Sequence, residues 1–565
     1  MVRNKKFYLY FVLIFSFFIG IQSYAAVSNS HSTINQNAVV SAHPLATQAG
    51  MDILAQGGNA FDAAIAISSM LTVVEPYHSG MGGGGFWLCR EHNNQEAFII
   101  DAREVAPGKA SSLMYMDDKG RVNSQLSQEG GLAAAIPGEV AAWEALSQKG
   151  RLALSKTLAP AINMANEGFA IDKKFAEFLA QKQKILRRYP SSQKIFFTQG
   201  MPLQKGDILI QKDLAHLLEI ISVKGAKGFY QGEVAKKLVT TVNAHGGIWS
   251  LEDLADYQVQ IRSPIQGEYE GMKITTMGPP SAGGITLLNA LNILSEYEMS
   301  PLAETDRIHL MAESLRRSFC DRAHYVGDPD FIDVPVEKLI SEENAEFWRK
   351  SININHATPS ELLSCMPTQN ESEGETTHYV VKDQFGNMIS ATTTVNFPFG
   401  CGLVAEGLGI ILNNEMDDFA TGNIGVNGYG LLNTNVNAIV PNKRPVSSMT
   451  PTIVETKEGT ALLGTPGGSR IPSMMLIAIL EMTKSHDPVA WVSSPRFHHQ
   501  YLPDVLSFEP DAFDEPMQKA LSLRGHKVQP TSRRYGNMQA LFWPKSSEDI
   551  MVGSDPRGVG KGMVH

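Results

Sequence analysis

The sequence predicts a fold of the α/β class, in which helices pack on β-strands. Residues 43–55 place apolar side chains at helical spacing and end at Gly57-Gly58, and Asn59 then caps a second helix over 60–70. Strands are indicated by the run 98–102 and by two runs, 379–381 and 388–396, that a short polar loop separates.

Further elements are predicted along the rest of the chain. Helices are expected at 136–143, at 158–167, at 213–221 with Asp213 as the N-cap, and at 305–320. Short strands are expected at 409–412 and 451–454. Helical patterns dominate residues 136–375, and no internal repeat is found.

Four consecutive glycines at 82–85 predict a place where backbones approach closely. No Gly-x-Gly-x-x-Gly opens a helix and no Gly-Lys-Ser/Thr follows, so the run does not indicate a nucleotide site. We expect a tight turn of the sheet beneath the active site, and no cofactor.

The composition is that of an ordinary globular protein. Hydrophobic residues make up 43% of the 565 residues and charged residues 19%, and the length allows roughly two to four domains. The formal net charge is −10, which argues against nucleic acid as a partner.

The four cysteines, Cys89, Cys320, Cys365 and Cys401, show no spacing typical of a metal site. One or two disulfide bonds are possible after export. Cys89 and Cys320 stand in apolar or helical contexts, so free and buried thiols are favoured at both positions.

Residues 1–26 are predicted to be a secretory signal. Arg3, Lys5 and Lys6 precede the apolar run 7–21, and small residues fit a cleavage site at 23–26. The run is short for a helix that spans a membrane. We therefore expect export to the periplasm or the outside, without stable membrane insertion after cleavage; the alternative is an uncleaved N-terminal anchor.

The strands predicted at 379–381 and 388–396 are expected to form a hairpin. A three-residue loop, 384–386, would end in a glycine with left-handed backbone. Continued from that loop, the register places Thr376 opposite Thr394, with Asn396 as a diagonal neighbour on the same face. The alternative is an ordinary pair of threonine-rich strands.

Thr376 is also a candidate for a nucleophile released by a chain break. The preceding residues 367–375 are polar and acidic and contain glycine and proline, so we expect them to be exposed. A break between Glu375 and Thr376 would give Thr376 a free α-amine, with a pKa of roughly 7.7–8.0. Such an amine can act as the base that activates its own hydroxyl.

Seven segments resemble the γ-glutamyltranspeptidase family of N-terminal-nucleophile hydrolases, in the family's order. They are 101–104 (DARE), 375–379 (ETTHY), 413–419 (NNEMDDF), 441–449 (PNKRPVSSM), 467–470 (GGSR), 495–500 (PRFHHQ) and 555–558 (DPRG). The resemblance implies a four-layer αββα sandwich. It also implies self-cleavage at Glu375–Thr376 into a large subunit, 27–375, and a small subunit, 376–565, which form a heterodimer.

The resemblance assigns catalytic roles to four residues. Thr376 is the nucleophile and Thr394 orients its amine or hydroxyl. Gly467 and Gly468 supply an oxyanion hole, because two backbone N–H groups can converge on one oxygen there.

Seven further residues are implied to bind the donor. Arg103 with two serines takes its α-carboxylate, two acids with Asn396 take its α-ammonium, and a tyrosine in the Gly/Asn-rich loop 420–433 closes over it as a lid. Beside Arg103 and Asn396, these residues are Glu415, Asp418, Tyr429, Ser447 and Ser448.

The implied reaction takes the γ-glutamyl group from glutathione or a related γ-glutamyl compound through a threonine ester. Water or the amine of an amino acid or dipeptide then accepts it. A metal at Glu415 and Asp418 is disfavoured because no His or Cys lies nearby in the sequence. The alternatives are a related acylase of the cephalosporin or glutaryl type, which would not need Arg103, and a non-catalytic exported binding protein.

Overall fold

The computed structural model describes residues 36–93, 96–363, 376–421, 425–545 and 549–565. The predicted signal segment 1–26, Cys365, and Glu375 on the acyl side of the predicted break lie outside these ranges.

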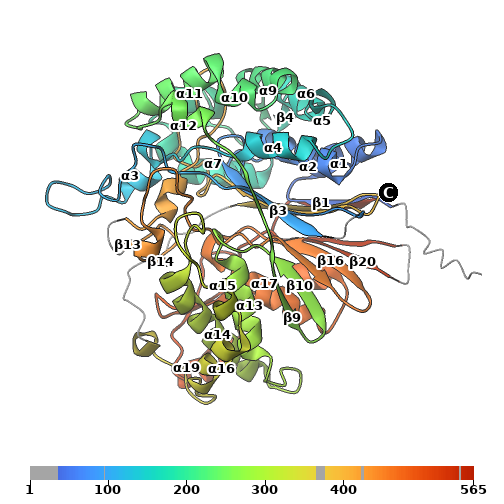
Figure 1. The fold of residues 1–565 in the computed structure, drawn as a ribbon, viewed down its shortest axis with the longest axis vertical. Coiled ribbons are helices and arrows are strands. Elements are labelled where there is room, and N and C mark those ends of the chain that lie inside the picture. The colour runs from blue at the N-terminus through green and yellow to red at the C-terminus, as the bar shows by residue number, and fades with distance from the viewer. Residues whose placement is uncertain (1–35, 94–95, 364–375, 422–424, 546–548) are drawn as a thin grey trace, which may run out of the picture. The chain divides into compact units, whose positions relative to one another are not determined.

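Two antiparallel sheets are stacked face to face, and helices cover the outer face of each (Figure 1). The larger sheet has the order β22-β1-β11-β12-β2-β3-β8, and the smaller one β21-β20-β16-β15-β10-β9. The predicted four-layer αββα sandwich is therefore confirmed.

The larger sheet consists of β1 (Ala38–Ser41), β2 (Gly84–Arg90), β3 (Ala97–Ala102), β8 (Gln260–Arg262), β11 (Thr377–Lys382), β12 (Met388–Thr394) and β22 (Lys561–Val564). The smaller sheet consists of β9 (Ile265–Tyr269), β10 (Met272–Thr276), β15 (Thr452–Glu455), β16 (Gly459–Gly464), β20 (Gln539–Pro544) and β21 (Met551–Ser554).

The helices over the larger sheet are α1 (Pro44–Ala55), α2 (Ala60–Val74), α4 (Glu139–Ser147), α6 (Ala159–Glu167), α7 (Lys173–Leu186), α9 (Lys212–Lys224) and α11 (Gly232–Ala244). Those below the smaller sheet include α13 (Gly283–Leu294), α14 (Glu304–Tyr325), α16 (Glu342–Lys350) and α17 (Ile471–Met482).

The predicted start of α2 is confirmed in detail. The Asn59 side chain accepts hydrogen bonds from the backbone N–H groups of Phe61 and Asp62, and Asp62 bonds back to the Asn59 N–H. This capping box satisfies donors that the first turn of a helix leaves free. The predicted N-cap of α9 was wrong by two residues, because Gln211 is the N-cap and Asp213 lies inside the first turn.

The predicted strand 409–412 is not formed. Gly409 has a φ of +75° and approaches the α9 residue Leu214, so the backbone leaves the extended conformation there. Ile411 makes only an isolated bridge to Val404. The apolar side chains of this run still enter the core, which is what made it resemble a strand.

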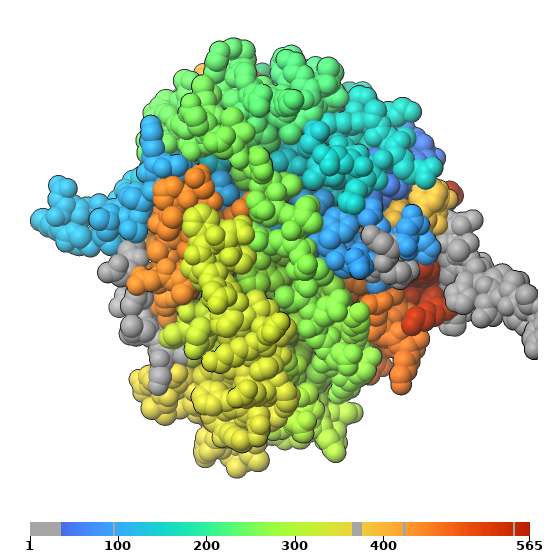
Figure 2. All heavy atoms as spheres, viewed as in Figure 1, coloured from blue at the N-terminus to red at the C-terminus, as the bar shows by residue number. Residues whose placement is uncertain are grey.

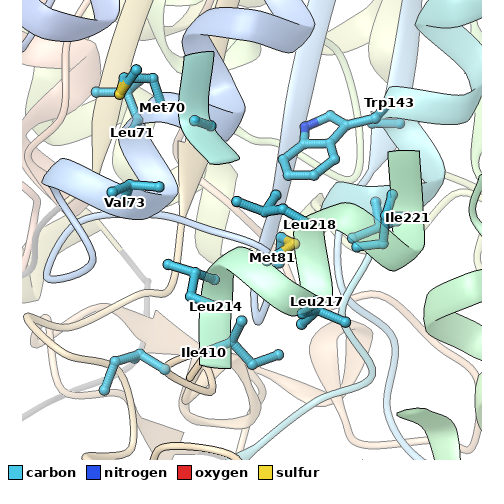
Figure 3. Packing of buried hydrophobic residues seen from close by; sticks show 14 of the residues in the cluster. Met70, Leu71, Val73, Met81, Trp143, Leu214, Leu217, Leu218, Ile221 and Ile410 are labelled. Atoms are coloured by element: carbon cyan, nitrogen blue, oxygen red, sulfur yellow. The ribbon is translucent and has the colours of Figure 1, made fainter. Parts of the chain in front are cut away.

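One hydrophobic core lies between the larger sheet and its helices, and Figure 3 shows part of it. Leu214, Leu217, Leu218 and Ile221 form the buried stripe of α9. The indole N–H of Trp143, which is fully buried, donates to Ser68 Oγ at 2.7 Å. A second core fills the space between the sheets and the lower helices.

The four glycines at 82–85 lie where the prediction placed them, against neighbouring backbone. A Cβ atom at Gly82 would lie 1.9 Å from the carbonyl oxygen of Ile411, and one at Gly83 would lie 2.0 Å from that of Thr394. No side chain fits at either position. The glycines therefore let the end of the Thr394 strand pack directly against this turn.

The thiol predictions are confirmed in part. Cys89 is free and buried, as predicted, and so is Cys401. The prediction for Cys320 was wrong, because this residue is disulfide-bonded. Its Sγ lies 3.9 Å from the carbonyl oxygen of Leu363, so α14 packs beside a segment that is distant in sequence, which local context does not reveal.

Within the described ranges no helix is long and apolar enough to cross a membrane. The same residues contain no group of three or more His, Cys, Asp or Glu side chains that could hold a metal ion.

Candidate active site

The hairpin that carries Thr376 has the predicted register. Thr377 pairs with Thr393 and Lys382 with Met388, and Gly386 in the loop has a φ of +88°. Continued by one residue, this register brings Thr376 Oγ1 to 3.4 Å from Thr394 Oγ1. Both threonines are 3% exposed, so the two hydroxyls meet in a nearly dry environment.

Asn396 follows the end of this strand and turns into the site. Its φ is +75°, and its backbone N–H donates to Thr394 Oγ1 at 2.8 Å. Its side-chain nitrogen donates to the carbonyl oxygen of Asn414 at 2.9 Å. The Thr394 hydroxyl is thus held by a backbone donor on one side and lies near Thr376 on the other.

Arg103 lies just past the end of β3 and is 1% exposed. Its guanidinium lies 2.6 Å from Glu415 and 2.5 Å from Asp418, and Nε donates to the carbonyl oxygen of Pro445 at 3.3 Å. Its backbone N–H donates to Asp101 Oδ1 at 2.9 Å. Arg103 is therefore a buried, oriented cation and not a surface arginine.

Three carboxyl groups surround this one guanidinium: those of Glu104, Glu415 and Asp418. Burial raises the pKa of Glu104 to about 7 and outweighs the opposing effect of Arg103. Burial also raises the pKa of Glu415 well above its usual range, again against Arg103. The cluster therefore favours a proton on at least one acid at neutral pH, because its negative charge exceeds its positive charge.

The two serines lie in a turn that the loop 278–284 supports. The Ser447 N–H donates to the carbonyl oxygen of Pro280 at 3.0 Å, and the Ala282 N–H donates to that of Ser447 at 2.9 Å. Ser447 Oγ accepts from the Met449 N–H at 3.1 Å. The loop 278–284 therefore holds the backbone of the serine turn in place, although none of its residues lines the pocket.

Gly468 and Tyr429 contact each other across the site. Gly467 and Gly468 have φ values of +138° and +54°. A methyl group at Gly468 would lie 2.4 Å from Cε1 of Tyr429. The Tyr429 hydroxyl donates to the side chain of Asn396, and the ring stacks on Phe397.

A single pocket collects nearly all predicted site residues. Gly467 does not line it, and Glu375 lies outside the described residues. The predicted residues that line it are Arg103, Thr376, Thr394, Asn396, Glu415, Asp418, Tyr429, Ser447, Ser448 and Gly468. Its volume of about 20 Å³ holds little more than one water molecule.

Two carboxyl residues beside the site were given no role from the sequence. Glu104 follows Arg103 in the motif, and neither of its oxygens has a hydrogen-bond partner among the described residues. Asp417 accepts from the Gly428 N–H at 2.6 Å and from Ser127 Oγ at 2.6 Å. Asp417 thereby joins the loop that carries Tyr429 to the short helix α3 (Gln125–Gln128). The blue segment that precedes α3 lies beside the orange segment on the surface (Figure 2). The acidic run 415–418 was the only available signal.

Solved structures define the class of protein. The chain resembles cephalosporin acylase from Bacillus halodurans with a TM-score of 0.82 and 27% identity, over 94% of this chain and 96% of that one. It also resembles the γ-glutamyltranspeptidase of Helicobacter pylori with a TM-score of 0.55 and 43% identity, over 56% of this chain and 92% of that one. The fold is that of the N-terminal-nucleophile hydrolases.

Sequence comparison then narrows the class to one family. The gamma-glutamyltranspeptidase family profile matches residues 46–565. A glutathione hydrolase proenzyme of Escherichia coli is 40% identical over 531 residues, which cover 93% of this chain and 91% of that protein. The chain belongs to the γ-glutamyltranspeptidase family, and it is an enzyme of the hydrolase and transferase type.

Acylases are also among the relatives. The acylase ACY 1 proenzyme of Pseudomonas sp. strain V22 is 36% identical over 525 residues, which cover 90% of each protein. Acylases and glutathione hydrolases are thus both among the similar proteins at 36–40% identity.

Proposed function

We propose that this chain is a self-processing γ-glutamyltransferase and hydrolase. The observation that carries the proposal is the dry pocket in which the Thr376–Thr394 hydroxyl pair lies with the Arg103–Glu415–Asp418 cluster. Because the E. coli relative is named a glutathione hydrolase proenzyme, glutathione is the proposed donor.

In the proposed processing step, Thr376 Oγ1 attacks the carbonyl carbon of Glu375. The peptide bond breaks as an ester forms, and water hydrolyses that ester to a new carboxylate and a free Thr376 α-amine. Strands β1, β2, β3 and β8 precede the break, whereas β11, β12 and β22 follow it in the same sheet. The proposed subunits, 27–375 and 376–565, would therefore remain interlocked as a heterodimer.

In the proposed turnover, the α-amine accepts the Thr376 hydroxyl proton while Oγ1 attacks the γ-carbonyl carbon of the donor. The N–H groups at Gly467 and Gly468 stabilise the oxyanion. The leaving amine takes the proton as the tetrahedral adduct collapses to a γ-glutamyl ester. Water, or the amine of an amino acid or dipeptide, then attacks the ester and restores the hydroxyl.

The donor's free α-carbon end is a zwitterion, and the cluster of Arg103, Glu415 and Asp418 offers charges of both signs to pair with it. The α-carboxylate would join Arg103 with Ser447 and Ser448, while the α-ammonium would join Glu415 and Asp418. The donor carboxylate would thus replace the two acids as the partner of Arg103, and the donor ammonium would pair with those acids. Because the added zwitterion is neutral, the net charge of the site stays unchanged. This charge pattern favours a γ-glutamyl donor over an acylase substrate that lacks the α-amino acid end.

We also propose that Tyr429 belongs to a lid. The pocket is too small for a glutamyl group as it stands, so the loop around Tyr429 must move before a donor can enter. We further propose that the signal 1–26 directs export of the protein to the periplasm or the outside.

The direct assay is release of 4-nitroaniline from γ-glutamyl-4-nitroanilide by the purified wild-type protein, with and without a dipeptide acceptor. We expect turnover in both cases and faster turnover with the dipeptide. The rate should rise with pH through roughly 7.7–8.0, because the α-amine is a base only when it is deprotonated. Turnover of a glutaryl anilide, which lacks the α-amine, in preference to the γ-glutamyl one would instead indicate an acylase.

Gly468→Ala is expected to lower kcat in this assay by about 10²-fold to 10³-fold, the typical effect of losing one oxyanion donor. Alanine is strained at the φ of +54° that Gly468 adopts, and its methyl group would clash with the Tyr429 ring. The backbone N–H of residue 468 must therefore shift. Gly200→Ala is the matched control, since Gly200 has a φ of +77° in open space. A variant that keeps wild-type kcat would rule out this role for Gly468.

A further inference from the structure

Glu75 carries a buried carboxyl group that the proposed mechanism does not use. It is the C-cap of α2, on the helix-covered side of the larger sheet, and it is 0% exposed. Its Oε2 accepts a hydrogen bond from Thr377 Oγ1 at 3.1 Å. Thr377 directly follows the proposed nucleophile in the chain, so this contact lies next to the residue on which catalysis depends.

The surroundings of Glu75 keep its carboxylate charged. Burial on its own would raise the pKa of Glu75. The His78 side chain, 3.5 Å away, and the nearby charges of His43 and Lys174 outweigh this effect and hold the pKa below its usual range. A charged acceptor makes a stronger hydrogen bond than a neutral one, so the Thr377 hydroxyl is held firmly.

The end of β11 next to Thr376 depends on such a contact, because the sheet supports it from one side. The pairing with β1 stops at Tyr379, opposite Ser41, whereas the pairing with β12 continues to Thr377. Among the described strands, β12 alone therefore holds the last turn of the ladder. A break before Thr376 would make this end a chain terminus, and termini lose order unless they are tied down.

The turn that begins at Glu75 also contacts the end of β12. The Val395 N–H, directly after Thr394, donates to the carbonyl oxygen of His78 at 3.1 Å. The His78 N–H in turn donates to the carbonyl oxygen of Glu75 at 2.9 Å. One turn thus holds both strand ends, and these ends bring the hydroxyls of Thr376 and Thr394 to 3.4 Å from each other.

We infer that Glu75 is a positioning residue for the nucleophile. Through the Thr377 hydroxyl, its carboxylate holds the end of β11, so that Thr376 Oγ1 stays beside Thr394. Successive side chains of a strand point to opposite faces, so Glu75 acts from behind the sheet without touching the donor. This inference rests on the proposed function, because it assigns Glu75 to the same nucleophile.

The test removes each partner of the contact in turn. Thr377→Val removes the hydroxyl and keeps the shape of the side chain, whereas Thr377→Ser keeps the hydroxyl. Glu75→Met removes the acceptor at similar volume, and the double variant Glu75→Met/Thr377→Val removes both partners. For each protein we measure kcat and KM for γ-glutamyl-4-nitroanilide, the extent of self-cleavage and Tm.

Thr47→Val is the matched control. Thr47 lies on α1 and is 0% exposed, as Thr377 is, and its hydroxyl donates to the carbonyl oxygen of Lys561 at 2.8 Å. The control therefore loses an equally buried hydrogen bond in another part of the fold. We expect it to lower Tm and to keep the wild-type kcat.

We expect Thr377→Val and Glu75→Met each to lower kcat by about tenfold and to keep KM within about twofold of wild type. The reason is that a misplaced nucleophile slows the reaction without weakening donor binding. Thr377→Ser should stay within about twofold of wild type in both parameters. The double variant should be no slower than the slower single variant, because both substitutions remove the same contact.

Incomplete self-cleavage of Thr377→Val that serine restores would support the inference in the same way, because the same hydroxyl attacks in processing. A wild-type kcat in Thr377→Val would overturn the inference. So would a serine variant as slow as the valine variant, or a double variant in which the two single losses multiply. If Glu75→Met does not fold, the valine and serine variants still test the contact.

Failure of this inference differs from failure of the proposed function. A wild-type protein that does not turn over the anilide contradicts the proposed function itself. An active wild type with an equally active Thr377→Val variant removes only the positioning role of Glu75.

Discussion

The Thr376→Ala variant is expected to remain one uncleaved chain with no measurable turnover. It removes the hydroxyl that lies 3.4 Å from Thr394 Oγ1 in the pocket that Arg103 also lines, and alanine cannot form the ester on which processing depends. Denaturing electrophoresis should show a single band where the wild type shows two, and γ-glutamyl anilide hydrolysis should fall to background.

Thr376→Ser is the matched control, because it keeps the hydroxyl and changes little volume in this buried position. We expect it to cleave itself and to retain activity, although more slowly. Two mature bands from the alanine variant would mean that another group or another protein makes the break. A folded but uncleaved serine variant would mean that the hydroxyl is not sufficient.

The Arg103→Ala variant is expected to bind the donor much more weakly than the wild type does. Removal of one partner of a buried charge pair typically costs 2–5 kcal/mol, so kcat/KM for γ-glutamyl anilide should fall by about 10²-fold to 10³-fold. The main effect should be on KM, because the guanidinium contacts the α-carboxylate and not the reacting carbonyl. Steady-state kinetics on the processed variant measures both parameters.

The variant also leaves Glu104, Glu415 and Asp418 buried without their cation, which lowers the free energy of unfolding. Arg103→Lys separates the two effects. It keeps the charge that stabilises the fold but loses the planar pair of donors, so we expect a nearly normal melting temperature together with weak donor binding. A wild-type KM in both variants would contradict the assigned role.

The parts of the site that short-range chemistry determines could be predicted from the sequence. The loop 384–386 has a glycine where the turn needs positive φ, and that turn alone sets the register that brings Thr376 to Thr394. Asn59 could be recognised as a cap because its partner, Asp62, lies three residues away.

Contacts between distant segments could not be predicted in this way. Family resemblance alone assigned Arg103, Glu415 and Asp418 to one donor site, and the ion pairs between them were not predicted. The disulfide bond of Cys320 and the loss of the strand 409–412 both depend on segments that are remote in sequence.

The most direct measurement is N-terminal sequencing, with intact mass, of the chains separated from the purified wild-type protein. We predict a small chain that begins at Thr376. A single intact chain, or a small chain with a different first residue, would contradict the claim that a backbone break supplies the catalytic base.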